Sequence, residues 1–301
     1  MAKIYTTWDA NETQVYEQQC GDKTETDSDF NKNIGAGFIM DAVGKSLKLK
    51  DSVGVFWPVA PNDPNELADT VTEFDIFSGM FSYTSNMSVF IGQQRPFKLT
   101  LQRDGSMKIT VNSVISTVSN EGTSGSVGVE MNDTSMLSLS SGIFEWGGRF
   151  STYDSAKLDI FTPTVVPHDS LSELHGGSVL NLTTNNIMVT RDQWRVSIFD
   201  GAPQLNIMAY SVGGDPLQSR DAEATYPKGI IDFASSSKGT VAIDMPSASA
   251  FTLSLLNQRG TFSLDGRVID MRTDGQFKVG YAQNVQRGDF TTQTMIITKE
   301  R

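Results

Sequence analysis

The chain has 301 residues, a formal net charge of −11 and a single cysteine, Cys20. This length suits one large β domain or two ordinary ones, one cysteine excludes an intramolecular disulfide, and the acidic balance argues against general binding of nucleic-acid phosphates. The N-terminal sequence MAKIYTTWDANETQ lacks an apolar segment, and no window of about 18 apolar residues occurs, so we expect neither a signal peptide nor a membrane span.

Residues 1–35 are polar and show no clear periodicity. We predict an N-terminal arm or ordered coil that lies on a neighbouring chain, with Ile4, Tyr5 and Trp8 as its anchors. Simple terminal disorder is the alternative. Cys20 is expected to be a small incidental thiol, because both histidines lie far away in the sequence.

Residues 36–160 are predicted to form a first β-barrel. Apolar and polar residues alternate over 97–101 and again over 107–111, and Asp104-Gly105 stands between the two runs. This pattern predicts an antiparallel hairpin with one buried face. A helix is expected over 63–78, because Asp63 and Pro64 resemble a helix start. Residues 119–128 are rich in Gly and Ser and are expected to form a surface loop.

Residues 161–301 are predicted to form a second barrel. Ser170 and Glu173 form a capping-box pattern, so a short helix is expected over 170–175. Residues 213–228 are expected to form a long polar loop. Over 251–300, apolar runs separated by Arg-Gly and Asp-Gly pairs predict a β-meander.

The two halves share a weak similarity between residues 103–109 and 272–279, both of which read as Arg, turn, polar, apolar, Lys, apolar. All hairpins share such features, and that remains one explanation. The other is a tandem of two similar β-barrels that divides near 155–168.

Few residues suggest a chemical site. His168 and His175 lie seven residues apart around the expected helix, which places them about 10 Å apart along its axis, too far to share one metal ion. Ser235 and Lys238 match an S-x-x-K pattern but lie between apolar runs, which indicates a turn. The remaining candidates are carboxylates for calcium (Glu25, Asp27 and Asp29) and tryptophans that could stack on sugars (Trp8, Trp57, Trp146 and Trp194). Solvated charges and core packing are their ordinary alternatives, and a pair of convergent glycosidase carboxylates is also left open.

The chain resembles bacteriophage structural proteins in its uncleaved N-terminus, Ser/Thr/Gly-rich strands, single cysteine, acidic charge and absence of a catalytic motif. Its layout is most similar to the double jelly-roll major capsid proteins of membrane-containing tailless phages. This resemblance implies an all-β fold of two tandem antiparallel jelly-roll barrels or sandwiches, divided as 1–35, 36–160 and 161–301, with two short helices in loops. No motif matches residue by residue, so no functional residue is carried over.

The resemblance implies a capsid protein that assembles as trimers in the virion, with no enzymatic activity and no cofactor. Its implied partners are copies of itself, other virion proteins and an underlying lipid membrane, but not nucleic acid. A tail, fibre or receptor-binding β-sandwich protein that binds surface glycans is the alternative. An all-β glycoside hydrolase or lyase is a third hypothesis.

Overall fold

The structure of the protein is a computed structural model. It describes residues 2–9, 11–26, 36–52, 55–57, 71–118, 127–189, 194–210, 215–219, 226–246, 250–287 and 290–300. The chain is predominantly β-stranded and divides into two compact units, Met1–Phe150 and Ser151–Arg301. We refer to them as unit 1 and unit 2.

Unit 1 consists of short and long strands and one 3-10 helix. The elements are β1 (Lys3–Ile4), β2 (Gln14–Glu17), η1 (Gln18–Cys20), β3 (Lys23–Thr26), β4 (Phe38–Asp51), β5 (Val55–Trp57), β6 (Thr72–Ser85), β7 (Val89–Ile91), β8 (Phe97–Leu101), β9 (Ser106–Val111), β10 (Val114–Ser116), β11 (Val127–Met131), β12 (Met136–Ser140) and β13 (Ile143–Thr152), which extends past the division.

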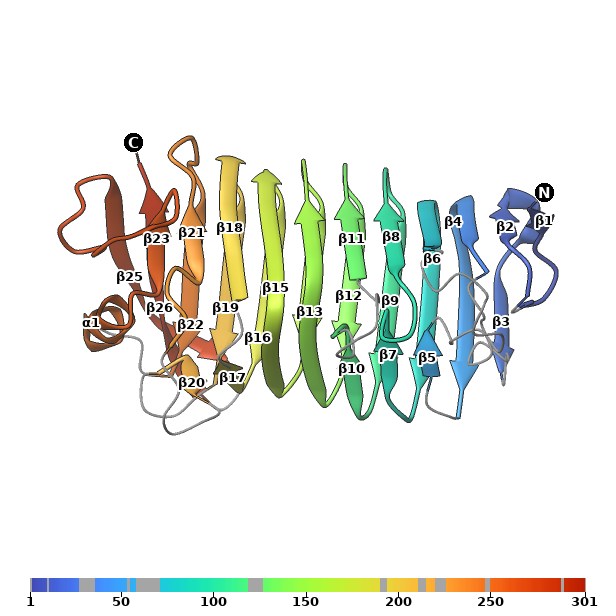
Figure 1. Ribbon diagram of the computed structural model, residues 1–301, viewed down its shortest axis with the longest axis horizontal. Coiled ribbons are helices and arrows are strands. Elements are labelled where there is room, and N and C mark those ends of the chain that lie inside the picture. The colour runs from blue at the N-terminus through green and yellow to red at the C-terminus, as the bar shows by residue number, and fades with distance from the viewer. Residues whose placement is uncertain are drawn as a thin grey trace. The chain divides into compact units, whose positions relative to one another are not determined.

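The strands of unit 1 pair in three ladders. One ladder joins β2, β4, β6, β8 and β11, a second joins β3, β4, β6, β9 and β12, and a third joins β5, β7, β10 and β13. Every described pairing in this unit is parallel, so the chain passes through the three ladders in turn and then starts again one rung further on (Figure 1). This is the arrangement of a parallel β-helix.

The predicted antiparallel pairing is therefore wrong for unit 1. Residues 97–101 and 106–111 are strands, as expected, but they do not form a hairpin. Both pair in parallel with β6, and they pair again with β11 and β12 of the next coil. Arg103, at φ 50°, turns the chain at a corner between two ladders. Jelly-roll barrels are built from antiparallel strands, so they do not follow from these ladders.

The helix expected over 63–78 is wrong where the structure describes it. Residues 72–78 belong to β6, residue 71 precedes that strand outside any helix, and residues 63–70 lie outside the described residues. Thr72, Phe74 and Ile76 are buried while Glu73 is exposed and Asp75 is partly exposed. This alternation with a period of two residues is typical of a strand. Parallel pairing with β4 and β8 holds these residues in the extended conformation.

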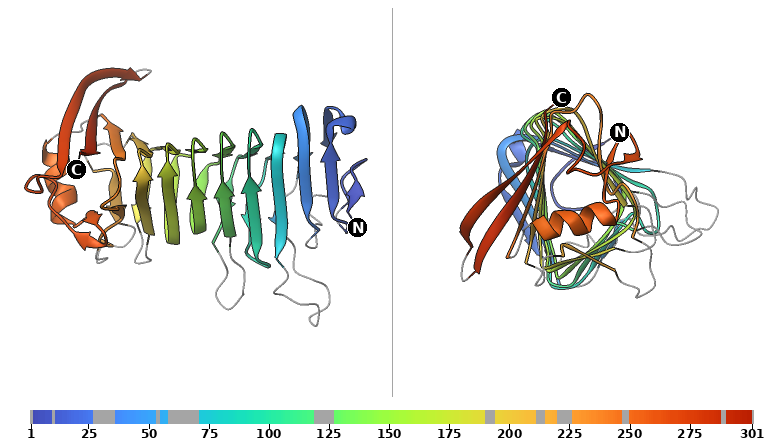
Figure 2. Two further views of the ribbon diagram at one scale, coloured as in Figure 1. Left: turned by 90° about the horizontal axis from the view of Figure 1, so that it is seen from above. Right: turned by 90° about the vertical axis from the view of Figure 1, so that its left-hand side faces the viewer.

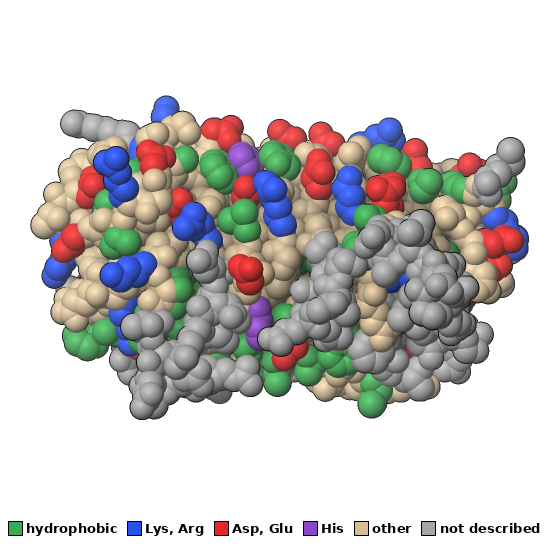
Figure 3. Space-filling model, viewed as in Figure 1, with side chains coloured by type: hydrophobic (Ala, Val, Ile, Leu, Met, Phe, Trp, Pro, Cys, Tyr) green, Lys and Arg blue, Asp and Glu red, His purple; other side chains and the backbone are tan. Residues whose placement is uncertain are grey.

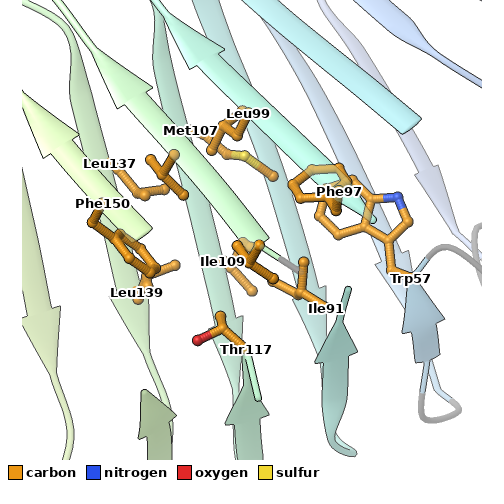
Figure 4. Close-up of a pocket in the computed structure, with 12 residues that line it drawn as sticks. Trp57, Ile91, Phe97, Leu99, Met107, Ile109, Thr117, Leu137, Leu139 and Phe150 are labelled. Atoms are coloured by element: carbon orange, nitrogen blue, oxygen red, sulfur yellow. The ribbon is translucent and has the colours of Figure 1, made fainter. Parts of the chain in front are cut away.

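The interior of unit 1 is an aromatic and aliphatic core. Phe38 and Phe74 are register partners on β4 and β6, and Phe97 on β8 is the partner of Thr72, two residues before Phe74. The ring centroid of Phe74 lies 5.4 Å from that of Phe38 and 5.6 Å from that of Phe97. Trp57 packs against Phe74 and Phe97 at 4.7 and 4.6 Å. Beside Trp57 and Phe97 is a cavity of about 20 Å³, lined almost entirely by apolar side chains (Figure 4). It has the size of about one water molecule and no polar cluster to hold one, so it is a packing defect rather than a ligand site.

The segment expected to be an irregular arm is partly built into the β-helix. Within residues 2–26, β1 pairs with β2, β2 pairs with β4 and β3 pairs with β4, all in parallel. Tyr5 and Trp8 are buried, whereas Ile4 is 50% exposed. Residues 27–35 lie outside the described residues. Contact of this segment with a neighbouring chain stays a prediction.

Three buried tyrosines predict that unit 1 loses stability at alkaline pH. Burial, together with a hydrogen bond from its hydroxyl to Glu25, raises the pKa of Tyr5. Burial also raises the pKa of Tyr83, and raises the pKa of Tyr16 to about 12. Because each folded pKa exceeds that of the unfolded chain, about 10, the stabilisation is complete below pH 10 and is lost as pH rises through the folded values.

We therefore expect the midpoint of thermal unfolding to fall steeply between about pH 10 and 12. Tyr16→Phe removes one of the three ionisations and should make the fall shallower, measured by circular dichroism at each pH. Appearance of the full tyrosinate absorbance near pH 10 in a protein that is still folded would contradict this account.

Unit 2 has the same kind of construction with a different end. Its elements are β14 (Lys157–Phe161), β15 (Thr164–Gly176), β16 (Val179–Thr184), β17 (Asn186–Val189), β18 (Trp194–Gly201), β19 (Gln204–Ala209), β20 (Leu217–Ser219), β21 (Ile231–Phe233), β22 (Thr240–Met245), α1 (Ala250–Gln258), β23 (Phe262–Leu264), β24 (Arg267–Val268), β25 (Phe277–Arg287) and β26 (Phe290–Lys299).

Three parallel ladders form the body of unit 2. They join β14, β16, β19 and β22; β15, β18, β21 and β23; and β15, β17 and β20. The first ladder continues in antiparallel pairing, with β26 beside β22 and β25 beside β26. Helix α1 lies across the end of the coils of this unit (Figure 2), and its Leu253 and Leu256 are buried.

Two expected elements of unit 2 are wrong. Residues 170–175 lie in β15 and pair with β18, so the capping-box pattern at Ser170 did not start a helix. Residues 251–256, expected as a strand, lie in α1. The helix signal there was Gly260, at φ 68°, which follows the helix as a left-handed C-terminal cap.

Part of the predicted C-terminal meander is confirmed. β23 and β24 form an antiparallel pair across Asp265 and Gly266, which have φ of 49° and 77°. Positive φ at both central residues is the signature of a type I′ turn. β25 and β26 also pair in antiparallel fashion. The long polar loop predicted for 213–228 is wrong at residues 217–219, which form β20 and pair with β17. Beside β20, Arg259 binds Asp215 with both terminal nitrogens, at 2.7 and 2.9 Å, and lies over the Tyr226 ring.

Candidate functional site

The candidate site lies on the outward side of the ladder formed by β14, β16 and β19 in unit 2. In β14, Leu158 and Ile160 point into the core, and Phe161 follows at the end of the strand with 63% of its surface exposed. A strand alternates its side chains, so Phe161 points outward. A single exposed phenylalanine is ordinary on a protein surface, and Phe161 draws attention because a surface hollow lies beside it.

Phe161 borders a surface hollow at the corner where these strands end. The hollow has a volume of about 140 Å³. It is lined by Phe161, Thr162, Pro163, Thr183, Thr184, Asn185 and Tyr210. Two aromatic side chains, the partly exposed Thr183 and the exposed amide of Asn185 therefore meet in one open depression, while Thr162 and Thr184 are buried.

Backbone hydrogen bonds between successive coils hold the walls of the hollow. The Thr162 amide donates to the Thr183 carbonyl at 3.0 Å, and the Asn185 amide donates to the Pro163 carbonyl at 2.9 Å. On the next coil, the Tyr210 amide donates to the Thr184 carbonyl at 3.0 Å. These bonds join three coils, so the hollow is formed before any ligand arrives, which lowers the entropic cost of binding.

A row of polar side chains runs beside the hollow on the same outward surface. Asn206 donates its amide to Asn181 at 2.8 Å, and Asn181 donates to Asp159 at 2.7 Å. Lys157 forms an ion pair with the other carboxylate oxygen of Asp159 at 2.9 Å. The three residues Asp159, Asn181 and Asn206 are in register, so their side chains form one rigid polar ladder with a repeat of about 4.8 Å.

The tryptophans are not the sugar platforms that the sequence suggested. Trp8, Trp57, Trp146 and Trp194 are at most 8% exposed. They fill the cores of the two units, in agreement with the core-packing alternative. The aromatic residues at the candidate site, the exposed Phe161 and the partly exposed Tyr210, were not singled out from the sequence. The sequence did contain a signal for Phe161. Leu158 and Ile160 mark the inward positions of this strand, so Phe161 is an apolar residue at an outward position.

The histidines lie on β15 rather than around a helix. An extended strand of seven residues separates His168 from His175 by about 23 Å, which excludes a shared metal ion. Figure 3 shows the two histidines at separate places on one face. His175 stacks between Tyr153 and Phe199, at 4.7 and 4.5 Å.

The His175 ring has one further contact. Its Nδ1 lies 2.7 Å from Asp200, and this hydrogen bond lowers the pKa of Asp200. The contacts of His175 therefore tie three coils of unit 2 together, and they explain the ring as a structural group. The predicted turn at Ser235–Lys238 is confirmed, because residues 235 and 236 form a turn and Ser237 caps the Gly239 amide.

The acidic candidates do not form a metal site within the described residues. Glu25 accepts hydrogen bonds from the Tyr5 hydroxyl at 2.7 Å and the Trp8 amide at 3.1 Å, while Asp27 and Asp29 lie outside the described residues. In the part of the chain that the structure describes, no three His, Cys, Asp or Glu side chains are grouped to hold a metal ion. Most of the predicted loop 119–128 also lies outside the described residues.

Comparisons with protein-family models, with curated proteins and with solved structures found no match to this chain. Among the described residues, no helix is long and apolar enough to cross a membrane.

Proposed function

We propose that this protein is a carbohydrate-binding structural protein, of the kind found in phage tails, fibres or receptor-binding complexes, and that the hollow beside Phe161 contacts the sugar. The observation that carries the proposal is the pairing of the exposed Phe161 ring with the Thr183 hydroxyl and the Asn185 amide in a rigid depression. Sugars offer apolar C–H faces that pack on aromatic rings, and hydroxyl groups that exchange hydrogen bonds with side chains such as Asn and Thr.

The polar ladder beside the hollow extends the surface available to an oligosaccharide. The spacing between its rungs, about 4.8 Å, is close to the length of one sugar ring. Asn181 and Asn206 keep their geometry through their hydrogen bonds to each other and to Asp159. A glycan chain lying along this direction would meet repeating polar groups after its terminal ring has packed on Phe161.

The viral setting rests on the sequence resemblance alone. The capsid role followed from a resemblance to proteins that consist of two antiparallel barrels. The described ladders are mainly parallel, so the fold gives that role no support. Self-assembly into trimers and contacts with other virion proteins or a lipid membrane stay predictions. The absence of enzymatic activity also stays a prediction, and Asp159 is the carboxylate of this surface at which it is best tested.

The test is a glycan array probed with the full chain, followed by titration of any glycan that binds. Phe161→Ala should weaken binding at least about tenfold, which corresponds to ~1.4 kcal/mol. Phe251→Ala is the matched control, because Phe251 is also in unit 2 and is 64% exposed. That variant should bind like the wild type.

Two results would overturn the proposal. The first is that no glycan binds, or that Phe161→Ala and Phe251→Ala bind as the wild type does. The second is catalysis: release of new reducing ends from a bound polysaccharide, abolished by Asp159→Asn, would make the protein a glycoside hydrolase or lyase rather than a binding protein.

A further inference from the structure

A surface of unit 1 carries lysines and hydroxyl groups without acidic side chains. It is the outward side of the ladder formed by β4, β6, β9 and β12, and we call it the lysine face. Three rows of side chains cross it in register. They are Ser46–Met80–Ser106–Met136, Lys48–Ser82–Lys108–Ser138 and Lys50–Thr84–Thr110–Ser140.

The lysine face contrasts with the composition of the chain. The protein has 35 acidic and 24 basic residues, yet none of the residues in the three rows is Asp or Glu. On the face shown in Figure 3, by comparison, basic and acidic side chains are interspersed. A local cationic surface on an acidic protein attracts an anionic ligand while the rest of the molecule repels it.

The three lysines of this face are exposed and form no ion pair with another described residue. Lys48, Lys50 and Lys108 are exposed, and none of them lies within 4.0 Å of a carboxylate among the described residues. Lys48 and Lys45 contribute to the lowered pKa of Asp22, whose main causes are the hydrogen bonds from Ser46.

The neighbouring carboxylates do not neutralise the face. Asp22 accepts from the Ser46 amide at 2.8 Å and from its hydroxyl at 2.9 Å, at one end of the first row. Glu25 points to the other side of its strand, where the Tyr5 hydroxyl donates to it. The central and third rows thus keep their positive charge available to a ligand.

The spacing of charge in the central row indicates a periodic ligand. Lys48 and Lys108 are separated by the strand that carries Ser82, so they are two rungs or about 10 Å apart. A disaccharide in an extended glycan has a similar length, about 10 Å, so a polyuronate that turns the carboxylate of every second sugar toward the protein would match the two cations. The hydroxyl groups of Ser82, Thr84 and Thr110 lie between and beside the lysines, where they can bind sugar hydroxyls.

We propose that the lysine face binds a linear anionic polysaccharide whose negative groups are uronate carboxylates. The proposal is independent of the Phe161 hollow, which lies in the other unit and lacks this charge. Nucleic acid is a poorer fit to these observations, because no exposed aromatic side chain occurs in the three rows for base stacking.

The experiment is a titration of the full chain with polygalacturonate and with its methyl-esterified form, which has the same backbone without the charge. The wild type should bind the charged polymer at least about tenfold more tightly than the ester, and the binding should weaken as salt is added. Lys48→Gln/Lys108→Gln should reduce the affinity for the charged polymer about tenfold or more.

Lys98→Gln is the control for charge loss, because Lys98 is an exposed lysine of unit 1 on the neighbouring strand β8. It should change the affinity less than about twofold. Thermal unfolding of each variant checks that the fold is kept, and exposed lysine substitutions are expected to leave it unchanged.

Several outcomes would overturn the proposal. They are the absence of binding to polygalacturonate, equal binding of the methyl ester, and equal loss of affinity in Lys98→Gln and the double variant. Tighter binding to duplex DNA or to vesicles that contain phosphatidylserine would assign the face to another class of partner. The Phe161→Ala variant should retain polygalacturonate binding, which separates this site from the hollow in unit 2.

Discussion

Replacing Phe74 by alanine should destabilise unit 1 by about 4 kcal/mol, in the range measured for buried phenylalanines. Phe74 is fully buried, and its ring contacts those of Phe38, Phe97 and Trp57 at 5.4, 5.6 and 4.7 Å. Its removal leaves a cavity between two neighbouring coils, and the parallel strands on either side are held by hydrogen bonds that limit their collapse into it. Urea unfolding followed by tryptophan fluorescence measures the effect.

Val71→Ala is the control for Phe74→Ala. Val71 lies three positions earlier and is 45% exposed, so its truncation should change the free energy of unfolding by less than about 0.5 kcal/mol. Equal effects of the two substitutions would mean that Phe74 does not occupy the interior of unit 1, and would contradict its packing against the other aromatic rings.

The second large effect is expected at Gly201, where two coils of unit 2 approach each other closely. Gly201 has φ 78°, and a Cβ atom added there would lie 2.4 Å from the carbonyl oxygen of Gly176. Backbone surrounds it, so no side chain can move aside. Gly201→Ala should cost about 3 to 4 kcal/mol, as the sum of left-handed strain and steric overlap.

Gly266 separates the two causes. It has nearly the same φ, 77°, but a Cβ atom added there would have nothing within 4 Å. Gly266→Ala should therefore cost only the left-handed strain, about 1 to 2 kcal/mol. If both variants lose the same stability in denaturant unfolding, the coils are not packed as closely at Gly201 as the structure places them.

Much of the strand content and of the core could be predicted from the sequence. Alternation identified 97–101 and 107–111 as strands, and their inward residues Phe97, Leu99 and Ile109 are buried. Alternation reports which side of a strand is buried, and it is the same in parallel and antiparallel sheets. The direction of pairing therefore could not be obtained from it.

The turn at Asp104-Gly105 held a clue that the hairpin was wrong. A two-residue turn there would pair Leu101 with Lys108, which places an inward residue opposite an outward one. At Asp265-Gly266 the flanking residues Leu264 and Arg267 do pair. Comparing the register on both sides of each Asp-Gly pair separates a hairpin from a corner of a β-helix better than the turn residues do.

The candidate sites depend on neighbours that the sequence does not reveal. Thr183 and Tyr210 approach Phe161 only because three coils of different length stack in one register. Lys48 and Lys108 share a row for the same reason, although they belong to strands far apart in the chain. The local pattern could identify each outward residue, but not the row to which it belongs.

Parallel rows across successive coils are the claim on which both proposed sites depend, and disulfide cross-linking tests them most directly. In a Cys20→Ser background, Lys108→Cys/Ser138→Cys should form an intramolecular disulfide under mild oxidation, because these residues are register partners and neighbouring strands lie about 4.8 Å apart, within disulfide range. Lys108→Cys/Thr100→Cys, the pair that an antiparallel hairpin with a three-residue turn over residues 103–105 would bring together, should stay reduced. A disulfide in the second pair and none in the first would contradict the parallel arrangement.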